Sequence, residues 1–492
     1  MISYLLRHVR DAATGAIVDA RLADGRVDLG PSIEPRPSDE VVDADGRWLI
    51  PGLWDAHVHF DQWAVSRSRL DLRGTATADA VTRIVGEAVL ENPEDEAVIF
   101  GFGYRASVWP RQPTVAELDA VTGARPAILI SGDMHNGWLN SAALALVGVS
   151  GIDGLIDEDR WFPLFAKIEP HVPDTASAVR DAMQAASARG VVGIVDLEFA
   201  ANHDVWPERL AGEPAPFRVR TGVYPDRMDE VLARGLTSGD ALDEHGLVRM
   251  GPLKIISDGS LGTRTAHCCD PYLDAADLTN ARGVQTVPAP ELRRLLGLAR
   301  GSGLDVALHA LGDAAVGEAL DAFEQTGARG SIEHAQVIRW EDIDRLARAG
   351  LTASVQPAQL LDDRDVMDRL WADRAERCFA LRTMRDRGVT LAMGSDAPVA
   401  PLDPWLAMAA AVHRSADGRE AWHPEQSLTA REALAASTDG INRIRTGDAA
   451  DVVLVDRDPF AGATPEESAR NLADMPVAAT FVGGRATHWG MQ

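Results

Sequence analysis

Eight short apolar runs alternate with helical segments, and this alternation restricts the fold more than any other feature of the sequence. The runs are LIPGLWDAHVH (49–59), GVVGIVDLEF (190–199), FRVRTGVY (217–224), PLKIISDGS (252–260), LDVALHALGD (304–313), IEHAQ (332–336), LTASVQP (351–357) and VTLAMGSDAP (389–398). Strands that alternate with helical patterns indicate parallel βαβ units. Eight such units predict a (β/α)8 barrel, in which functional side chains gather at the C-terminal ends of the strands.

The two ends of the chain carry a different pattern. Residues 1–50 and 440–492 alternate apolar and polar side chains around turn dipeptides such as Asp24-Gly25 and Gly483-Gly484, which is typical of hairpins. We therefore expect an α/β fold in which a small composite β-sandwich (residues 1–50 plus 440–492) flanks a TIM-like barrel (51–439). Residues 60–175 are too many for one strand-to-helix unit, so we interpret them as an insertion over the barrel mouth.

Six side chains that can contribute to a metal site lie at or near the ends of these predicted strands. They are His57, His59, Lys254, His309, His334 and Asp396. The first two are one residue apart, so they leave an extended strand on the same face. Each residue alone has an ordinary explanation, such as a hydrogen-bonded core histidine or an aspartate that caps a helix. Their joint convergence on one rim favours a shared metal site.

Lysine is almost absent from this chain. It occurs only at Lys167 and Lys254, and all the remaining residues among the 48 lysines and arginines are arginine. A lysine on a catalytic strand therefore suggests a role that needs an amine, which arginine cannot fill. The alternative is that both lysines are retained by chance.

At these motifs the chain resembles the amidohydrolase superfamily of metal-dependent hydrolases, over nearly its whole length. PGLWDAHVHF, LHALGDAAVGEALDAFE, IEHAQ and GSDAP are similar to the strand-end motifs of that superfamily. KIISDGSLGTRTAHCCDPY and SGDMHNGWLNSAAL are similar to its YtcJ-like (amidohydrolase 3) branch, which includes N-substituted formamide deformylases.

The resemblance implies a binuclear site for two divalent ions, with zinc expected and manganese or iron as alternatives. His57, His59 and Asp396 would bind the more buried ion, and His309 and His334 the second. A CO2-derived carbamate on Lys254 would bridge them. The implied reaction is hydrolysis of a C–N bond, in an amide, a formamide or a related group, by a metal-bound hydroxide. Asp396 would act as the catalytic acid and base.

Four further residues are candidates for substrate contacts. Ser260 and Arg264 follow the fourth strand, and their alternative role is to order that loop. Tyr104 and His135 lie in the insertion, and their alternative role is structural.

Two other functions remain open. The first is a mononuclear deaminase of the same superfamily. Such enzymes place a glutamate three residues after the strand-five histidine, where this chain has Gly312. The second is a non-catalytic scaffold with the same fold, which would be expected to have lost some of the six ligands.

Composition narrows the partners. The formal net charge is −26 and no basic run stands out, so nucleic acid is an unsuitable partner and a small-molecule substrate is expected. No apolar run reaches the ~18 residues of a membrane span, and the N-terminus lacks a secretory signal pattern. Three cysteines form no disulfide framework, which suits the cytoplasm. A homodimer is left open.

Overall fold

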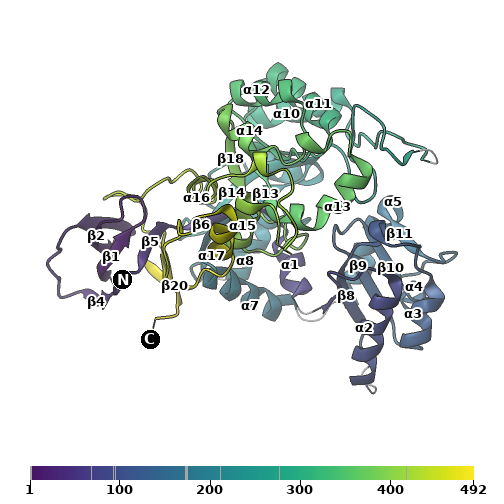
Figure 1. Ribbon diagram of the computed structural model, residues 1–492, viewed down its shortest axis with the longest axis horizontal. Helices are drawn as coiled ribbons and strands as arrows, with labels where there is room; N and C mark the ends of the chain where they lie inside the picture. The colour runs from purple at the N-terminus through teal and green to yellow at the C-terminus, as the bar shows by residue number, and fades with distance from the viewer. Residues whose placement is uncertain are drawn as a thin grey trace.

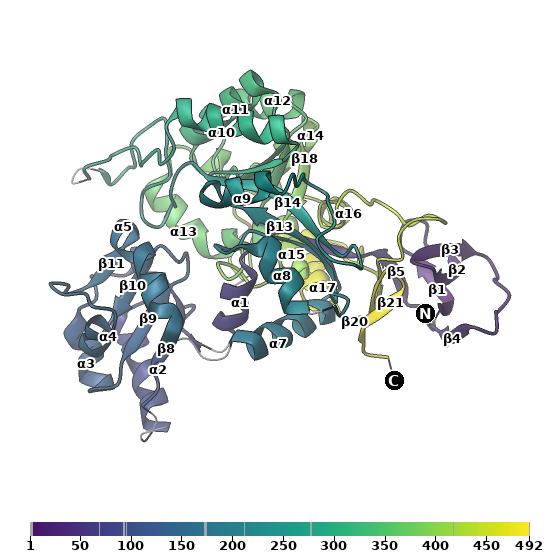
Figure 2. The same cartoon turned by 180° about the vertical axis from the view of Figure 1, so that it is seen from behind.

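The computed structural model of the protein describes residues 3–67, 69–91, 94, 96–171, 175–210, 212–275, 278–416 and 418–491. A sheet from both termini lies at one end of the molecule, a barrel occupies the centre, and the insertion lies at the other end (Figure 1). The reverse view in Figure 2 shows the same arrangement, with both termini beside the terminal sheet. The predicted α/β fold class is confirmed.

Eight parallel strands form the central sheet, which nearly closes into a barrel. They are β6 (Leu53–Val58), β12 (Val191–Asp196), β13 (Arg218–Val223), β14 (Val248–Ile256), β15 (Val306–Ala310), β16 (Gly330–His334), β17 (Thr352–Val355) and β18 (Thr390–Met393). The first and last strands meet at their C-terminal ends. There the Asp396 N–H donates to the His57 carbonyl at 2.7 Å, and the His59 N–H donates to the Ala397 carbonyl at 2.8 Å. Six of the eight predicted runs contain one of these strands, and the runs 252–260 and 332–336 overlap β14 and β16, which begin earlier than predicted.

Helices surround the barrel and supply the outer half of its core. They are α7 (Thr175–Ala188), α8 (Asn202–Leu210), α9 (Met228–Ala233), α10 (Ala289–Ser302), α11 (Asp313–Thr326), α12 (Trp340–Arg348), α13 (Leu360–Leu370), α14 (Leu381–Asp386), α15 (Pro404–His413), α16 (Ala430–Ala436) and α17 (Pro465–Ala473). Leu320 and Phe323 of α11, for example, are buried in the same cluster as Val306 and Leu308 of β15. Burial of such side chains contributes about 1.5–3 kcal/mol each.

One helix begins later than its strand suggests. β14 ends at Ile256, and α10 does not begin until Ala289. The intervening loop is held on the barrel rim by Asp258, whose carboxylate accepts the N–H groups of Leu311 and Gly312 at 3.0 and 2.9 Å. The loop therefore borders the end of β15.

The terminal sheet joins both ends of the chain. Its strands are β1 (Ser3–Asp11), β2 (Ile17–Ala23), β3 (Arg26–Gly30), β4 (Asp39–Asp43), β5 (Trp48–Pro51), β19 (Val452–Val455), β20 (Val477–Val482) and β21 (Arg485–Trp489). The Asp24-Gly25 and Gly483-Gly484 hairpins have positive φ at both turn residues, as type I′ turns require. Leu6 and Phe481, from opposite ends of the chain, share one apolar core. Not every pairing is antiparallel, because the chain crosses back before β4 and β5, which both run parallel to β1.

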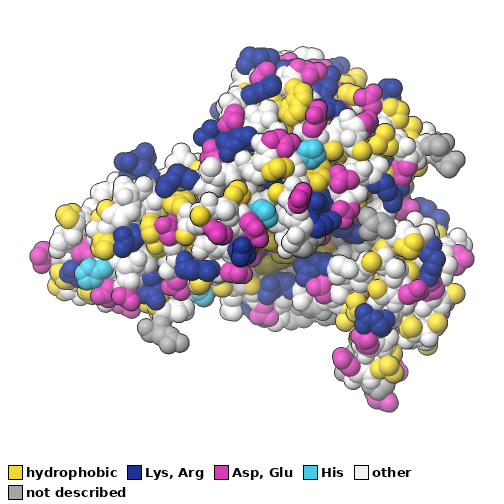
Figure 3. Space-filling view, viewed as in Figure 1, with side chains coloured by type: hydrophobic (Ala, Val, Ile, Leu, Met, Phe, Trp, Pro, Cys, Tyr) yellow, Lys and Arg dark blue, Asp and Glu magenta, His cyan; other side chains and the backbone are white. Residues whose placement is uncertain are grey.

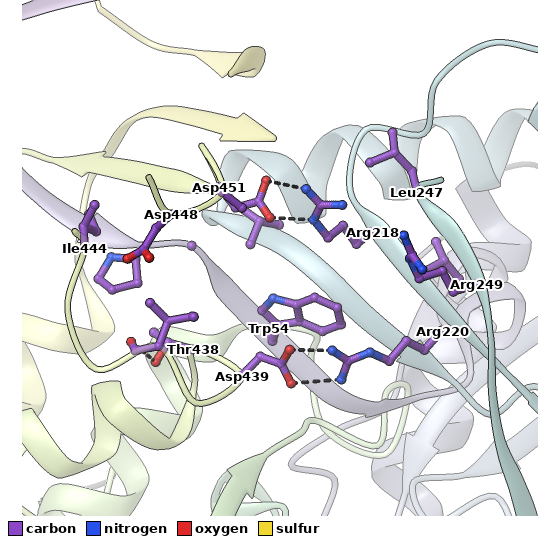
Figure 4. A pocket seen from close by; sticks show the side chains of 16 residues that line it. Trp54, Arg218, Arg220, Leu247, Arg249, Thr438, Asp439, Ile444, Asp448 and Asp451 are labelled. Atoms are coloured by element: carbon purple, nitrogen blue, oxygen red, sulfur yellow. Dashed lines mark hydrogen bonds and ion pairs between the residues drawn. The ribbon is translucent and has the colours of Figure 1, made fainter. Parts of the chain in front are cut away.

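Two arginine–aspartate pairs lie at the N-terminal end of the barrel, and one of them fastens the terminal sheet to it (Figure 4). Arg218 donates to both carboxylate oxygens of Asp451, and Arg220 donates to both oxygens of Asp439. The Arg220 guanidinium also lies 4.3 Å from the centroid of the Trp54 ring. Bidentate pairs fix orientation as well as adding attraction. We interpret the small cavity between them, about 210 Å³, as part of this junction.

The insertion contains its own sheet and helices. The strands are β7 (Leu70–Asp71), β8 (Ile99–Tyr104), β9 (Ala127–Ser131), β10 (Asn136–Leu139) and β11 (Leu155–Asp157), with helices α2 (Ala78–Glu91), α3 (Val115–Thr122), α4 (Ser141–Leu146), α5 (Glu158–Trp161) and α6 (Phe165–Ile168). Arg105 donates to Asp363 of α13 at 2.9 Å, so the insertion contacts the side of the barrel on which β17 ends. The helix α1 (Phe60–Ser66) instead packs with α7. The domain limits at residues 60 and 175 stay predictions.

The surface is mixed in charge. On the face drawn in Figure 3, arginines and lysines are interspersed with aspartates and glutamates. Among the described residues, we find no helix that combines the length and apolar character needed to cross a bilayer.

Candidate metal centre

The structure brings the six candidate ligands to the C-terminal rim of the barrel. His57 lies in β6, His59 directly precedes α1, Lys254 lies in β14, His309 in β15, His334 ends β16, and Asp396 follows β18. The ring centroids of His57 and His334 are 5.1 Å apart, and those of His309 and His334 are 4.5 Å apart. The rim therefore carries one continuous group of donors.

Three of these residues form a close cluster. Asp396 Oδ1 lies 3.3 Å from His57 Nε2 and 3.5 Å from His59 Nε2, and each of the three residues offers a donor atom within 4.8 Å of the others. Burial alone would raise the pKa of Asp396, but the neighbouring histidines hold it well below its ordinary value. The carboxylate is thus ionised, as a metal ligand must be.

Two residues of the rim adopt left-handed backbone conformations. The φ angle is +55° at Asp396 and +73° at His334. Such conformations cost a non-glycine residue on the order of 1–3 kcal/mol and tend to occur at functional sites. At both positions the turn comes directly at or after the end of a strand.

Lys254 is buried among these groups. Lys254 is 1% exposed, and its Nζ lies 3.2 Å from His57 Nε2. Desolvation lowers the pKa of Lys254, although the carboxylates of Glu333 and Asp396 act in the opposite direction. The amine is therefore more readily neutral than a surface lysine.

His309 and His334 lie beside this cluster. His309 Nε2 is 3.2 Å from the Gly259 carbonyl and 3.3 Å from Asp258 Oδ1. If it donates there, the lone pair of the ring is on Nδ1. His334 Nδ1 is buried and has no hydrogen-bond partner among the described residues. Desolvation, aided by His309, lowers the pKa of His334 well below its ordinary value, so its imidazole is neutral and can act as a ligand.

Glu333 is a site residue that the sequence reasoning missed. Its Oε2 lies 2.7 Å from His57 Nδ1, an arrangement that fixes the tautomer and orientation of a metal-binding histidine. Strand alternation would point Glu333 and His334 to opposite faces, but the left-handed backbone at His334 breaks the alternation. The sequence did carry one signal for this role: Glu333 lies in a strand predicted to be buried, and a buried charge requires a partner.

We expect Glu333→Gln to weaken metal binding by roughly 10- to 100-fold, the usual effect of losing such an outer partner. The glutamine keeps the size of the side chain but loses the carboxylate that fixes His57. Chelator competition measures the change. Glu425→Gln is the matched control, because Glu425 also contacts a histidine, His423 Nδ1 at 2.9 Å, on an exposed loop. Equal affinity in the two variants would contradict the role of Glu333.

Gln359 is a second missed residue. It directly precedes α13, and its Nε2 donates to Asp396 Oδ2 at 3.1 Å. One oxygen of Asp396 is thus held by an amide while the other faces the histidines. Nothing in the sequence near Gln359 indicates this contact, which depends on how the loop after β17 folds back over the rim.

The rim residues fit divalent metal ions. Four imidazoles and a carboxylate supply the nitrogen and oxygen donors that zinc, manganese and iron accept. His59 Nδ1 and His334 Nδ1 are buried without partners among the described residues, so each ring needs a ligand or proton acceptor that the described side chains do not supply.

The substrate candidates fall into two groups. Tyr104 and Arg264 line one polar cavity of about 490 Å³ between the insertion and the loop after β14. The Tyr104 hydroxyl donates to Asn136 Oδ1 at 2.7 Å, and Arg264 pairs with Asp274. His135 instead packs edge-on against Phe162, and the Ser260 hydroxyl is 2.9 Å from that of Thr263. None of the six metal candidates lines the cavity, and neither do His135 and Ser260, so contacts of these four residues with a substrate stay predictions.

Comparisons with known proteins agree with this geometry. The chain is 30% identical to the protein YtcJ of Bacillus subtilis (strain 168), over 86% of this chain and 87% of the relative. It is 27% identical to an N-substituted formamide deformylase of Arthrobacter pascens, over 96% and 95% of the two chains. The crystal structure of an uncharacterized metal-dependent hydrolase from Pyrococcus horikoshii OT3 superposes with a TM-score of 0.75 at 25% identity, over 94% of this chain and 98% of the other.

A family model also matches most of the chain. The model of the amidohydrolase family Amidohydro_3 covers residues 40–488, which include the barrel, the insertion and the part of the terminal sheet that follows β3. The predicted superfamily and branch are thereby confirmed, and the chain belongs to the amidohydrolase family.

Proposed function

We propose that the protein is a binuclear metal-dependent hydrolase that cleaves a C–N bond, in an amide, a formamide or a related group, of a small molecule. The observation that carries the proposal is the convergence of His57, His59 and Asp396 with a buried Lys254, within one group that also holds two further histidines. A relative named as an N-substituted formamide deformylase supports C–N bonds as the target.

In this proposal the residues divide between two ions. His57, His59 and Asp396 would hold one ion, and His309 and His334 would hold the other, with Lys254, as its carbamate, as a further oxygen ligand. When bound, the ions, zinc for preference, would lower the pKa of water toward about 7 and polarise the carbonyl group of the substrate.

Asp396 moves the proton. Its carboxylate takes a proton from the attacking water and delivers it to the leaving nitrogen, so that the amine departs neutral. The Gln359 amide keeps one carboxylate oxygen fixed during this transfer. Glu333 holds the His57 ring in the tautomer whose Nε2 lone pair faces the site.

The geometry at Gly312 disfavours the deaminase alternative. A Cβ atom added to Gly312 would lie 2.1 Å from the carbonyl oxygen of His267, so the loop after β15 has no room for the glutamate that deaminases place there. The scaffold alternative conflicts with the complete set of six donors. Metal analysis separates the three: two ions per chain for the hydrolase, one for the deaminase and none for the scaffold.

A hydrolysis screen tests the function. Metal-loaded protein is assayed against amides, formamides, N-acyl amino acids, carbamates and lactones, with metal content measured in parallel. We expect turnover of a C–N substrate by protein that holds two ions. Turnover of lactones alone, or of an aminated heterocycle with a single ion bound, would overturn the proposal. The proposal includes no nucleic acid or membrane partner, and a homodimer is compatible with it.

The cavity lined by Tyr104 and Arg264 is proposed to influence substrate choice. Tyr104→Phe removes a hydroxyl that donates to Asn136, and a single hydrogen bond is worth about 0.5–1.5 kcal/mol. We therefore expect the ratio of kcat/KM between two substrates to change by roughly 2- to 10-fold while metal content stays at two. Tyr4→Phe in the terminal sheet is the control. A Tyr104 variant that loses metal would contradict this assignment.

A further inference from the structure

His59 lacks the support that His57 has. The His57 ring is fixed by Glu333 at Nδ1, and metal-binding histidines nearly always donate their second ring nitrogen in this way. His59 Nδ1 is buried, yet among the described residues it has no hydrogen-bond partner. Some other contact must hold the imidazole in place.

An aromatic ring lies against His59. The Phe199 ring is stacked on the imidazole, with centroids 5.2 Å apart and an angle of 15° between the planes. Phe199 stacks in turn on Tyr224, at 4.8 Å and 25°. Offset stacks of this kind are attractive beyond simple burial. Phe199 is nevertheless 57% exposed, which is unusual for a large apolar side chain and indicates that its place is not set by the core.

The loop that carries Phe199 is tied to the residues on either side of His59. The Leu197 N–H donates to the Val58 carbonyl at 2.8 Å. Glu198 accepts the backbone N–H and the side-chain amide of Gln62, at 3.0 and 2.6 Å, and also the Phe199 N–H at 2.9 Å. Through these bonds the end of β12 and the start of α1 keep the two rings in register.

A second set of hydrogen bonds, made by Asp196 and Tyr224, holds the same loop. Asp196 Oδ1 accepts the N–H groups of Phe60 and Glu198, both at 3.2 Å, and Asp196 Oδ2 accepts the indole N–H of Trp206 at 2.7 Å. The Tyr224 hydroxyl donates to the Leu197 carbonyl at 2.8 Å. The exposed Phe199 ring is thus presented by a loop whose backbone is fixed at several points.

We propose that Phe199 is a positioning residue for His59: its ring, in place of a hydrogen bond, sets the plane in which His59 offers a nitrogen to a metal ion. The inference rests on the proposed metal centre. It concerns only the ion that His59 helps to hold, and it predicts that a planar side chain is needed at residue 199.

The test compares planar and non-planar apolar side chains at residue 199. Phe199→Leu removes the ring and keeps an apolar side chain, whereas Phe199→Tyr keeps the ring. Apo-protein is titrated with Co2+ under chelator competition, and the visible spectrum is recorded, because it responds to ligand geometry. Phe162→Leu is the matched control, since Phe162 is also exposed and also packs on a histidine, His135, within the insertion.

We expect Phe199→Leu to weaken binding of one of the two ions by roughly 3- to 10-fold, the worth of one aromatic stack, and to change the Co2+ spectrum. Phe199→Tyr and Phe162→Leu should match the wild type. Because Phe199 is exposed, the melting temperature should change little. If the leucine variant fails to fold, Phe199→Met replaces it.

Two results would overturn the inference. One is wild-type affinity and spectrum in the leucine variant. The other is equal impairment in the leucine and tyrosine variants, which would assign the effect to the loop instead of the ring. If the wild type binds two ions and the leucine variant weakens one, but no C–N substrate is hydrolysed, the proposed function fails and the positioning role stands. If the wild type binds no metal, both fail.

Discussion

Asp396→Asn is expected to yield a folded protein whose turnover is reduced by ~10²–10⁴-fold, the usual contribution of one general acid–base group. Asparagine has nearly the same shape and its carbonyl can still accept the Gln359 amide that now contacts Oδ2 at 3.1 Å. It cannot take a proton from water or deliver one to a leaving nitrogen. It is also a weaker metal ligand, and excess metal offsets that weakness. A fall in kcat under excess metal therefore reports the lost proton transfer.

The experiment needs measurements that separate chemistry from binding. We would measure kcat at saturating metal, metal content, and the melting temperature. Asp439→Asn is the matched control, because Asp439 is paired with Arg220 at the opposite end of the barrel. It should keep near-normal kcat. An Asp396→Asn enzyme with near-normal kcat would remove Asp396 from the proton-transfer role, and a variant that melts early would assign the loss to folding.

The barrel could be predicted because its signal is local and repeated. Several strands, such as β12, β15 and β17, are apolar runs of four to six residues that are largely buried, and such strands can be recognised directly in the sequence. The positions of His57 and His59 followed from strand periodicity, and those of His309 and His334 from the rule that function gathers at strand ends. The structure places all of them at that rim.

The supporting residues could not be predicted in the same way, because their contacts join distant segments. Glu333 contacts His57, which is 276 positions away in the chain, and the neighbouring His334 adopts a left-handed backbone conformation at the end of β16. Phe199 lies at the end of a strand that offered no metal ligand. Tyr104 and His135 were grouped as insertion residues, yet only Tyr104 lines the polar cavity. Loop geometry decides these cases, and single-sequence periodicity carries no information about it.

We expect Lys254→Arg to lower activity by more than the roughly 10- to 100-fold that loss of a partner such as Glu333 costs. Arginine keeps a positive charge but cannot react with CO2, because it stays protonated. In the proposed site, a carbamate on Lys254 would supply oxygen ligands to the ions, and forming it requires a neutral amine. The burial of Lys254 favours that neutral form, because desolvation lowers the pKa of its amine.

The chain offers its own control for this substitution. Lys167 is the other lysine, and its Nζ donates to the Val147 carbonyl at 2.9 Å in the insertion. Arginine can make the same bond, so Lys167→Arg should retain activity and two ions. If Lys254→Arg is equally active, the bridge is ruled out.

The proposed carbamate also leads to a prediction that would not follow from any other role of Lys254. Protein prepared without bicarbonate and metal should be poorly active, and the two should restore activity only when added together, because the ions hold the adduct that they share. Lys254→Ala should regain part of its activity with a short carboxylic acid, whose two oxygens can replace those of the carbamate in the space that the lysine side chain leaves. A lysine that served only as a buried cation would respond to neither treatment, since neither restores a positive charge. Bicarbonate dependence of the wild type together with carboxylate rescue of the alanine variant would therefore identify the group on Lys254 as an oxygen donor.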